Sequence, residues 1–402
     1  MDDNRLPSWN DKPRFVRDGV TWLGYILLAA PSYTLGAFGP FMPFLRSELD
    51  LSYTIAALHV TAWAVGNLLC GAFGDRSVAA LGRANAAWLG TAGLSLAIVV
   101  LVMAHHPVFT IAAAFVAGGM GTLISQCINA IMADRFGDER TLGYMEANVA
   151  ASSFCLLAPI AVSGCVRFGA GWRAAMMLPI IIFVFLFAIF GKRKIPTGEA
   201  SLQKADSNFG LPAAYWAYWT LIMFAVACEW SLIFWSAEFL HQSANLSKPD
   251  AAASVAVFLV AMLSGRIFGR IAARHLSTQL MLPLASFIAV TGFFIYWLGP
   301  TAAIKLGGLL ITGLGISNFF PLSLSAAVST SPAQASIATA RISVSTGLAV
   351  IVAPLMLGFV ADHTNIFTAY AVIAFLLLSC TAMAFVANRF ARQHSAAAAT
   401  LR

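Results

Sequence analysis

Charged side chains are scarce in this sequence. Asp, Glu, Lys and Arg make up only 10% of the 402 residues, whereas 59% are hydrophobic, and the mean hydropathy is +0.80. A soluble domain usually carries about a quarter of its residues as charged groups, because its surface faces water. The composition therefore excludes an ordinary soluble fold and predicts a polytopic membrane protein.

Motifs for ATP binding and for catalysis are also missing. The P-loop pattern G-x-x-x-x-G-K-[ST], which cradles phosphates, does not occur, so direct ATP drive has no support. The seven histidines and six cysteines show neither metal-ligand spacing nor the pairing of a nucleophile with a base. We therefore expect the protein not to be an enzyme and to use no cofactor and no bound metal.

Apolar stretches long enough to cross a bilayer recur along the chain. A transmembrane helix needs about 20 apolar residues, and these stretches are continuous and rich in Gly and Ala, unlike alternating barrel strands. The sequence therefore predicts an all-α polytopic membrane protein with twelve transmembrane helices. We place these helices at residues 19–45, 52–73, 84–104, 107–134, 142–166, 172–191, 213–240, 250–274, 278–298, 302–328, 335–361 and 365–388.

The two halves of the chain repeat one pattern. Three pairs of anchors share an offset of 194 or 195 residues: Gly71 with Gly265, Gly121 with Gly315, and Pro159 with Pro354. Between the halves, residues 192–212 are polar, begin with basic residues and are typical of a flexible linker. We predict two pseudo-symmetric six-helix bundles, the N-terminal half at 1–191 and the C-terminal half at 213–402, with a cytoplasmic linker at 192–212.

Lys and Arg are distributed unevenly between the two sides of the predicted helices. With the N-terminus in the cytoplasm, 19 of the 24 basic residues lie on the cytoplasmic side. The positive-inside rule then places both termini in the cytoplasm and the chain in the cytoplasmic (inner) membrane. The pI near 9.3 does not indicate nucleic-acid binding, because no soluble basic face is predicted. We expect the lipid bilayer, a small-molecule substrate and H+ as partners, and a monomer.

The region between the second and third predicted helices resembles the signature loop of the major facilitator superfamily. The resemblance rests on Gly71, Gly74, Asp75, Arg76, Gly82 and Arg83. Gly171-Trp172-Arg173 is also similar to that superfamily, whereas residues 77–81 lengthen the usual loop. The resemblance covers essentially the whole chain and implies a secondary transporter that alternates access to a midplane site. It does not identify the substrate.

Glu229 is the foremost candidate for a functional residue, because it is the carboxylate nearest the centre of any predicted helix. A charge at a helix centre costs about 2.5–3.5 kcal/mol and by default marks a functional site. We expect Glu229 to load and release a proton. Two alternatives are pairing with a cationic group of the substrate and a protonated structural Glu. The segment Glu229-Trp230-Ser231 is similar to a stretch of the fucose-permease branch.

Polar and aromatic side chains near the middle of the helices are candidates for substrate binding. Thr122, Gln126 and Asn129 are spaced i, i+4 and i+7, so they share one helical face. The whole set suits a small amphiphilic solute, and the alternative for each member is interhelical hydrogen bonding or packing. The candidates are Tyr33, Thr122, Gln126, Asn129, Asn148, Ser152, Trp230, Ser317, Phe320 and Ser323.

Charges near the cytoplasmic ends of the helices predict an inner gate that closes in the outward-open state. We expect Asp75 to pair with Arg341, and Glu146 to pair with Arg266 or Arg270. The alternative is that these groups are solvated, since surface ion pairs contribute only about 0–1 kcal/mol. The predicted gate residues are Asp75, Arg76, Glu146, Arg266, Arg270 and Arg341.

These observations together predict a proton-coupled symporter that imports a small organic solute. Drug exporters of the resembled superfamily carry a glycine-rich pattern in the fifth helix, and residues 150–164 contain few glycines. A proton-driven exporter of amphiphilic compounds is therefore the second hypothesis. A membrane-embedded sensor or enzyme on the same fold is the alternative from a different class.

Overall fold

The computed structural model describes residues 17–136, 140–191, 211–330 and 334–400 of the chain. These described residues are almost all helical and include no β-strand. The helices are α1 (Gly19–Leu49), α2 (Tyr53–Leu81), α3 (Arg83–Met103), α4 (Pro107–Phe136), α5 (Arg140–Arg167), α6 (Gly171–Phe190), α7 (Ala213–Ser243), α8 (Lys248–Ala272), α9 (Thr278–Leu298), α10 (Ala302–Ile316), α11 (Phe319–Ser329), α12 (Ala335–His363), α13 (Ile366–Ala369) and α14 (Ala371–Thr400).

Eleven segments of the described chain are long and apolar enough to cross a membrane. One of them combines α10 with α11, and another combines α13 with α14. Helix α1 is less apolar than these eleven and contains Pro31, Pro40 and Pro43. With 31 residues it is long enough to cross a membrane, and we count it as the twelfth span. The predicted all-α fold with twelve transmembrane helices is confirmed.

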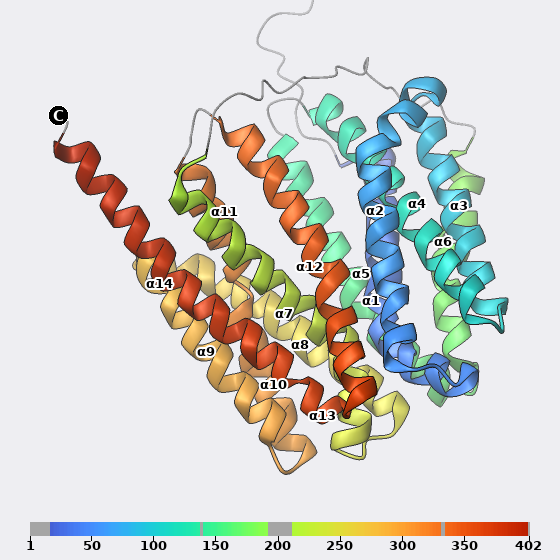
Figure 1. Ribbon diagram of the computed structural model, residues 1–402. Coiled ribbons are helices and arrows are strands. Elements are labelled where there is room, and N and C mark those ends of the chain that lie inside the picture. Colours follow the sequence, from blue (N-terminus) through green and yellow to red (C-terminus); the bar gives the residue numbers. More distant parts are fainter. Residues whose placement is uncertain (1–16, 137–139, 192–210, 331–333, 401–402) are drawn as a thin grey trace, which may run out of the picture.

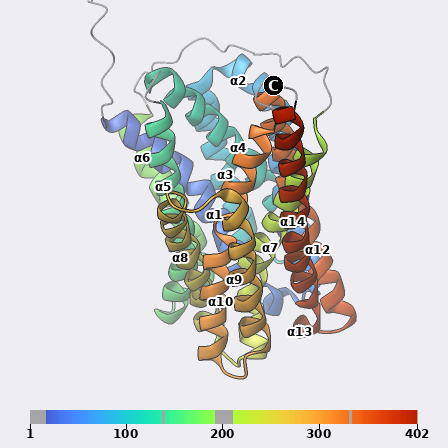
Figure 2. The ribbon, with the colours of Figure 1, turned by 90° about the vertical axis from the view of Figure 1, so that its left-hand side faces the viewer.

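The spans form two bundles that lie side by side, α1–α6 in the first bundle and α7–α14 in the second (Figure 1). Both views place the start of α1 and the end of α14 at the same end of the molecule (Figure 2). We call this end the terminal face, and we call the end where α1 stops and α2 begins the opposite face. Between the bundles, α1 contacts α7, α2 contacts α12, and α5 contacts α8.

Glycine permits the closest approach between the two bundles. A Cβ atom added to Gly39 of α1 would lie 2.1 Å from the carbonyl oxygen of Ile233 on α7. Within the first bundle, a Cβ on Gly118 would lie 2.0 Å from the carbonyl oxygen of Trp63. Small residues at helix crossings let membrane helices gain packing energy without a hydrophobic drive from water.

The expected single helix at 302–328 is interrupted at Ser317 and Asn318, which separate α10 from α11. The Asn318 side chain donates a hydrogen bond of 2.8 Å to the carbonyl oxygen of Gly265 on α8. Its amide occupies the space beside Gly269, where an added Cβ would lie 2.1 Å from Asn318 Oδ1. The break therefore lies at a contact between helices that are distant in sequence.

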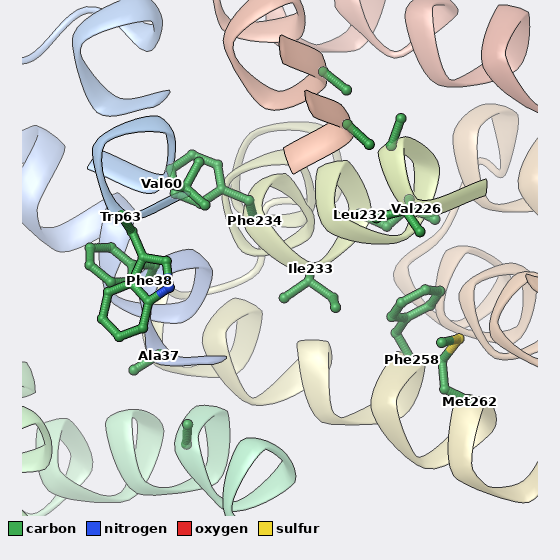
Figure 3. Packing of buried hydrophobic residues seen from close by; sticks show 14 of the residues in the cluster. Ala37, Phe38, Val60, Trp63, Val226, Leu232, Ile233, Phe234, Phe258 and Met262 are labelled. Atoms are coloured by element: carbon green, nitrogen blue, oxygen red, sulfur yellow. The ribbon is translucent and has the colours of Figure 1, made fainter. Parts of the chain in front are cut away.

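A buried hydrophobic cluster joins the bundles. Figure 3 shows Phe38 and Trp63 of the first bundle and Phe234 of the second bundle within this cluster. The Phe38 and Trp63 rings pack edge to face, with centroids 5.6 Å apart. Across the bundles, the Tyr53 ring lies 5.7 Å from that of Trp235. This packing positions α7, the helix that carries Glu229, against α1 and α2.

Candidate transport site

A cavity of about 500 Å³ lies between the bundles. Trp63 and Asn67 of α2 line one wall, while Trp230 of α7 and Ser343 and Thr346 of α12 line the other. The remaining wall is mostly apolar. A largely apolar cavity with a few polar groups is the usual form of a small-molecule site.

A polar extension of about 230 Å³ continues from this cavity into the first bundle, and the two share Trp63 and Asn67. Thr122, Gln126 and Asn129 of α4 line the extension together, as their helical spacing predicts. The Gln126 side-chain N–H donates to the carbonyl oxygen of Gly71 at 3.3 Å, whereas its Oε1 atom is buried without a hydrogen-bond partner. The extension is therefore lined by polar groups from one face of α4.

Glu229 lines a third cavity, of about 140 Å³, with Ser152 and Cys155 of α5 and Arg266 of α8. Trp230 lines both this cavity and the central one, so the two spaces adjoin. The Glu229 side chain is 18% exposed and that of Arg266 is 46% exposed. Arg266 Nη2 lies 3.9 Å from Glu229 Oε1, which is an ion pair beyond hydrogen-bond distance.

Hydrogen bonds to α12 hold α7 in place on both sides of Glu229. Trp219 Nε1 donates to the carbonyl oxygen of Arg341 at 2.9 Å, and Ser345 Oγ donates to that of Trp219 at 3.1 Å. Farther along α7, Trp235 Nε1 donates to the carbonyl oxygen of Pro354 at 3.0 Å. Anchoring on both sides fixes the position at which Glu229 enters the cavity wall.

Three predicted binding residues are packed inside the bundles instead. The Tyr33 hydroxyl donates to the carbonyl oxygen of Ala175 at 2.8 Å, within the first bundle. Ser317 Oγ donates to the carbonyl oxygen of Leu314 at 2.7 Å, and Ser323 is fully buried. The hydroxyls of Tyr33 and Ser317 thus make local or interhelical contacts, as small polar groups in membrane bundles often do, whereas the buried Ser323 hydroxyl has no hydrogen-bond partner among the described residues. We therefore leave these three residues out of the candidate site.

Two further candidates lie outside the linings of these three cavities. Asn148 is exposed, and its side-chain N–H donates to the carbonyl oxygen of Tyr144 on its own helix at 2.8 Å. Phe320 is half-buried on α11. Neither position supplies a reason to include the residue in the site.

Glu146 has its charge partner within the first bundle. It accepts hydrogen bonds of 3.1 Å from the Arg17 guanidinium and of 2.9 Å from the Tyr25 hydroxyl. Among the described residues, the acid that pairs with Arg266 is Glu229, and Arg270 is exposed. The expected pairing of Glu146 with Arg266 or Arg270 is therefore not formed in this structure.

The Asp75 and Arg76 side chains lie outside the described residues, so the pairing of Asp75 with Arg341 stays a prediction. The Arg341 guanidinium lies 5.7 Å from the centre of the Trp216 ring, within reach of a cation–π contact. Arg341 is therefore near the terminal part of α7 and is half-buried.

Ion pairs that the predicted gate does not include join the bundles at the opposite face. Arg46 of α1 pairs with Glu238 of α7, whose side chain is only 3% exposed. The Arg46 guanidinium also lies 3.7 Å from the centre of the Tyr53 ring. Nearer the surface, Arg167 of α5 pairs with Asp250 of α8. Helices α1 and α7 occupy equivalent places in the repeat, so opposite charges near their ends were an available signal.

A carboxylate from α12 caps α2 at the same face. The two oxygens of Asp362 accept hydrogen bonds of 2.7 and 2.8 Å from the backbone N–H groups of Tyr53 and Thr54. About two turns farther along α2, Thr61 Oγ1 donates to the carbonyl oxygen of Ile351 at 3.0 Å. The first N–H groups of a helix have no partner within the helix, so an acceptor there is favourable.

These contacts close the opposite face beyond the cavities. Glu229 precedes Glu238 by nine residues on α7, which is roughly 13 Å along a helix axis. The cavity residues therefore lie on the terminal-face side of the closing contacts. Twelve spans in two bundles, with a cavity between them that is closed toward one face, define a secondary transporter. The sequence profile of the Major Facilitator Superfamily matches residues 21–337, and the chain belongs to this superfamily.

Similar proteins support the same class. An uncharacterized MFS-type transporter of Yersinia pestis is 23% identical over 359 residues, which cover 88% of this chain and 92% of that protein. A bacterial homolog of the human lysosomal transporter Spinster, in an inward-facing conformation, matches with a TM-score of 0.75 and 13% identity, covering 92% of this chain and 96% of that chain. A D-xylose–proton symporter matches with a TM-score of 0.68 and 12% identity, covering 90% of this chain and 96% of that chain. At these identities the structural matches show the shared fold.

Proposed function

We propose that this transporter imports a small organic solute together with a proton across the cytoplasmic membrane, and that Glu229 carries the proton. One observation carries the proposal. Among the described residues, Glu229 is the one carboxylate found in the linings of the three cavities; it lines the smallest of them, where it faces the cation Arg266. An ionisable residue at this depth in a membrane bundle is costly and needs a function.

The Glu229 and Arg266 pair can link proton binding to movement. A nearby cation favours an ionised carboxylate, whereas removal from water favours the protonated form. Because α5 of the first bundle lines the same cavity as this pair, a movement of one bundle against the other changes the exposure of Glu229 to water and so the balance between these forms. A carboxylate that meets two compartments in turn can therefore take up a proton in one state and release it in the other.

The solute site is formed by the cavity walls. Thr122, Gln126 and Asn129 supply hydrogen-bonding groups from α4, while Trp63 and Trp230 supply flat apolar surfaces. This combination suits an amphiphilic solute that can form hydrogen bonds with the first bundle through part of its body. The D-xylose–proton symporter has the same fold, which is consistent with proton coupling in this chain.

Alternating access would move the N-terminal half (1–191) against the C-terminal half (213–402), with residues 192–212 as the cytoplasmic linker. We assign the terminal face to the cytoplasm, so the structure represents an inward-open state closed by Arg46–Glu238 and the Asp362 cap. In the outward-open state these contacts separate, and the Asp75–Arg341 contact closes the terminal face. Repeat-related bundles that rock around a central site commonly work in this way.

A ligand screen with a matched variant tests the proposal. The purified wild type, Glu229→Gln and Glu48→Gln are screened by thermal shift against a chemically broad panel at pH 5.5 and pH 7.5. Glu48 is the control because it is a carboxylate of α1 that pairs with Arg173 and lines none of the three cavities. A ligand at a hundredfold excess over its dissociation constant stabilises the state that binds it by about 2.7 kcal/mol. We expect a solute whose stabilising effect depends on pH in the wild type and in Glu48→Gln, but not in Glu229→Gln. An identical pH dependence in all three proteins would assign Glu229 a structural role.

A further inference from the structure

Arg266 presents unused hydrogen-bond donors to the cavity beside Glu229. Its side chain is 46% exposed, and the 3.9 Å to Glu229 is too long for a hydrogen bond. Arg17 and Arg46, by comparison, both donate hydrogen bonds to carboxylates. Among the described residues, the Arg266 guanidinium has no hydrogen-bond acceptor, although it carries five N–H donors.

The unused donors identify the chemistry of a ligand. A planar guanidinium binds the two oxygens of a carboxylate through parallel hydrogen bonds, and it repels a cation. We infer that the transported solute is a small organic monocarboxylate, whose carboxylate binds Arg266 in place of Glu229. This inference rests on the proposed function and names its substrate class.

The cavity around Arg266 has the size and polarity for such a solute. Its volume of about 140 Å³ equals that of about five water molecules at roughly 30 Å³ each. Leu156, Leu259 and Met262 supply apolar walls, and Ser152 adds one hydroxyl group. The space therefore fits a carboxylate with a short carbon chain, and the adjoining central cavity can receive a larger body beyond Trp230.

Charge balance links this solute to the proton. Ionised Glu229 and Arg266 are neutral together, so an added carboxylate would leave one unpaired negative charge in a site that is partly removed from water. Protonation of Glu229 restores neutrality and releases Arg266 for the solute. The other titratable groups nearby are the Cys155 thiol on α5 and the exposed Arg270, one turn farther along α8. One proton and one carboxylate then bind together without net charge.

A series of isosteric ligands tests the inference. Straight-chain monocarboxylic acids of two to six carbons, with the amide and the primary amine of each carbon skeleton, are added to the full-length protein at pH 5.5 and pH 7.5. Thermal shift is measured for the wild type, Arg266→Gln, Arg266→Lys and Glu229→Gln. Arg274→Gln is the control, because it removes the same charge from an exposed arginine just beyond the end of α8.

We expect at least one acid to raise the Tm of the wild type and of Arg274→Gln, more at pH 5.5 than at pH 7.5, while its amide and amine do not. Arg266→Gln should lose the shift, and Arg266→Lys should keep only part of it, because lysine lacks the two-pronged geometry. Glu229→Gln should bind the acid equally at both pH values. Arg266→Lys also keeps the test valid if Arg266→Gln does not fold.

The possible failures separate this inference from the proposed function. No shift from any acid, an equal shift from amides or amines, or an undiminished shift in both Arg266 variants overturns the carboxylate assignment. A different ligand with pH dependence that requires Glu229 would then leave the proposed proton coupling intact. An acid that binds through Arg266 without pH dependence would instead support the substrate class and overturn the coupling.

Discussion

The carboxylate of Asp362, near the end of α12, accepts a hydrogen bond of 2.7 Å from the backbone N–H of Tyr53, the first residue of α2. Its other oxygen accepts a hydrogen bond from the N–H of Thr54. Helix α2 belongs to the first bundle and α12 to the second, so one bundle supplies a helix cap to the other. This cap can exist only while the opposite face is closed.

Removing the cap should therefore favour opening of the opposite face. An N-cap contributes about 0.5–2 kcal/mol, so we expect Asp362→Ala to shift the conformational equilibrium about 2- to 30-fold toward the open form. Spin labels at the exposed positions His105 and Asn365, in a background without the native cysteines, report the distance between the bundles at this face. Thr301→Ala removes a cap within the second bundle and should leave this distance unchanged. Identical distance distributions in all proteins would contradict the prediction.

The buried pair of Arg46 and Glu238 should be far more sensitive to a single replacement than to a double one. Glu238→Leu leaves Arg46 charged and largely buried, and breaking such a pair costs about 3–5 kcal/mol. The double variant Arg46→Met with Glu238→Leu leaves no unpaired charge, so its unfolding free energy should lie closer to that of the wild type. Unfolding in mixed micelles measures these differences.

An exposed ion pair across the same interface is the control for this comparison. Arg167 and Asp250 have side chains that are 59% and 45% exposed, so Arg167→Gln should change the unfolding free energy by less than about 1 kcal/mol. A double variant less stable than either single variant would show that an unpaired charge is not the main cause of the lower unfolding free energy of the single variant.

The close contact at Gly39 should act on the same equilibrium. An alanine at this position would bring its Cβ to 2.1 Å from the carbonyl oxygen of Ile233, so α1 and α7 must separate. We expect Gly39→Ala to lower the Tm and to increase the distance between labels at His105 and Asn365. Gly164→Ala is the matched control, since a Cβ at that position meets no atom within 4 Å. Equal label distances in the two variants would show that a Cβ at Gly39 does not separate α1 from α7.

Acidification should destabilise the N-terminal end of α1, because it protonates the carboxylate of Asp18. Burial opposes ionisation of Asp18, but hydrogen bonds from the Thr21 backbone and hydroxyl, and the charge of Arg135, outweigh it and lower the pKa of Asp18. A carboxyl with a lowered folded-state pKa stabilises the protein above its ordinary pKa of about 3.9, and this stabilisation is lost as pH falls through the lower value. The Tm of Asp18→Asn should therefore fall less than the Tm of the wild type between pH 6 and pH 3.5. A steeper or equal loss in the variant would contradict this assignment.

The helices were predictable because few backbone conformations are stable inside a membrane. Polar backbone groups must be satisfied within each span, so continuous apolar stretches indicate helices. The interruption at Asn318 was not predictable, since the hydrogen bond that accompanies it is made to Gly265 on another helix. Helical spacing likewise predicts that Thr122 and Gln126 share a face, but it cannot show which face of α1 meets α6, where the Tyr33 hydroxyl bonds to Ala175.

The charges were predictable in kind but not in pairing. Glu229 was recognisable from its depth in an apolar stretch, whereas its partner Arg266 was assigned to a gate at the helix end. Glu146 was matched to the second bundle through the repeat, although Arg17 lies beside it in this state. The role of Asp362 is not predictable, because its partners are backbone N–H groups, which every residue except proline carries.

Replacement of Glu229 should separate solute exchange from proton-driven accumulation. Glu229→Gln keeps the shape of the side chain but cannot change its charge, so the transporter can still exchange labelled for unlabelled solute without moving protons. In proteoliposomes with a gradient of one pH unit, cotransport of one proton supports an accumulation ratio of about ten. We expect a ratio near ten for the wild type and for Glu48→Gln, and a ratio near one for Glu229→Gln with exchange retained. Tenfold accumulation by Glu229→Gln would mean that another group carries the proton, and loss of exchange would mean that Glu229 binds the solute itself.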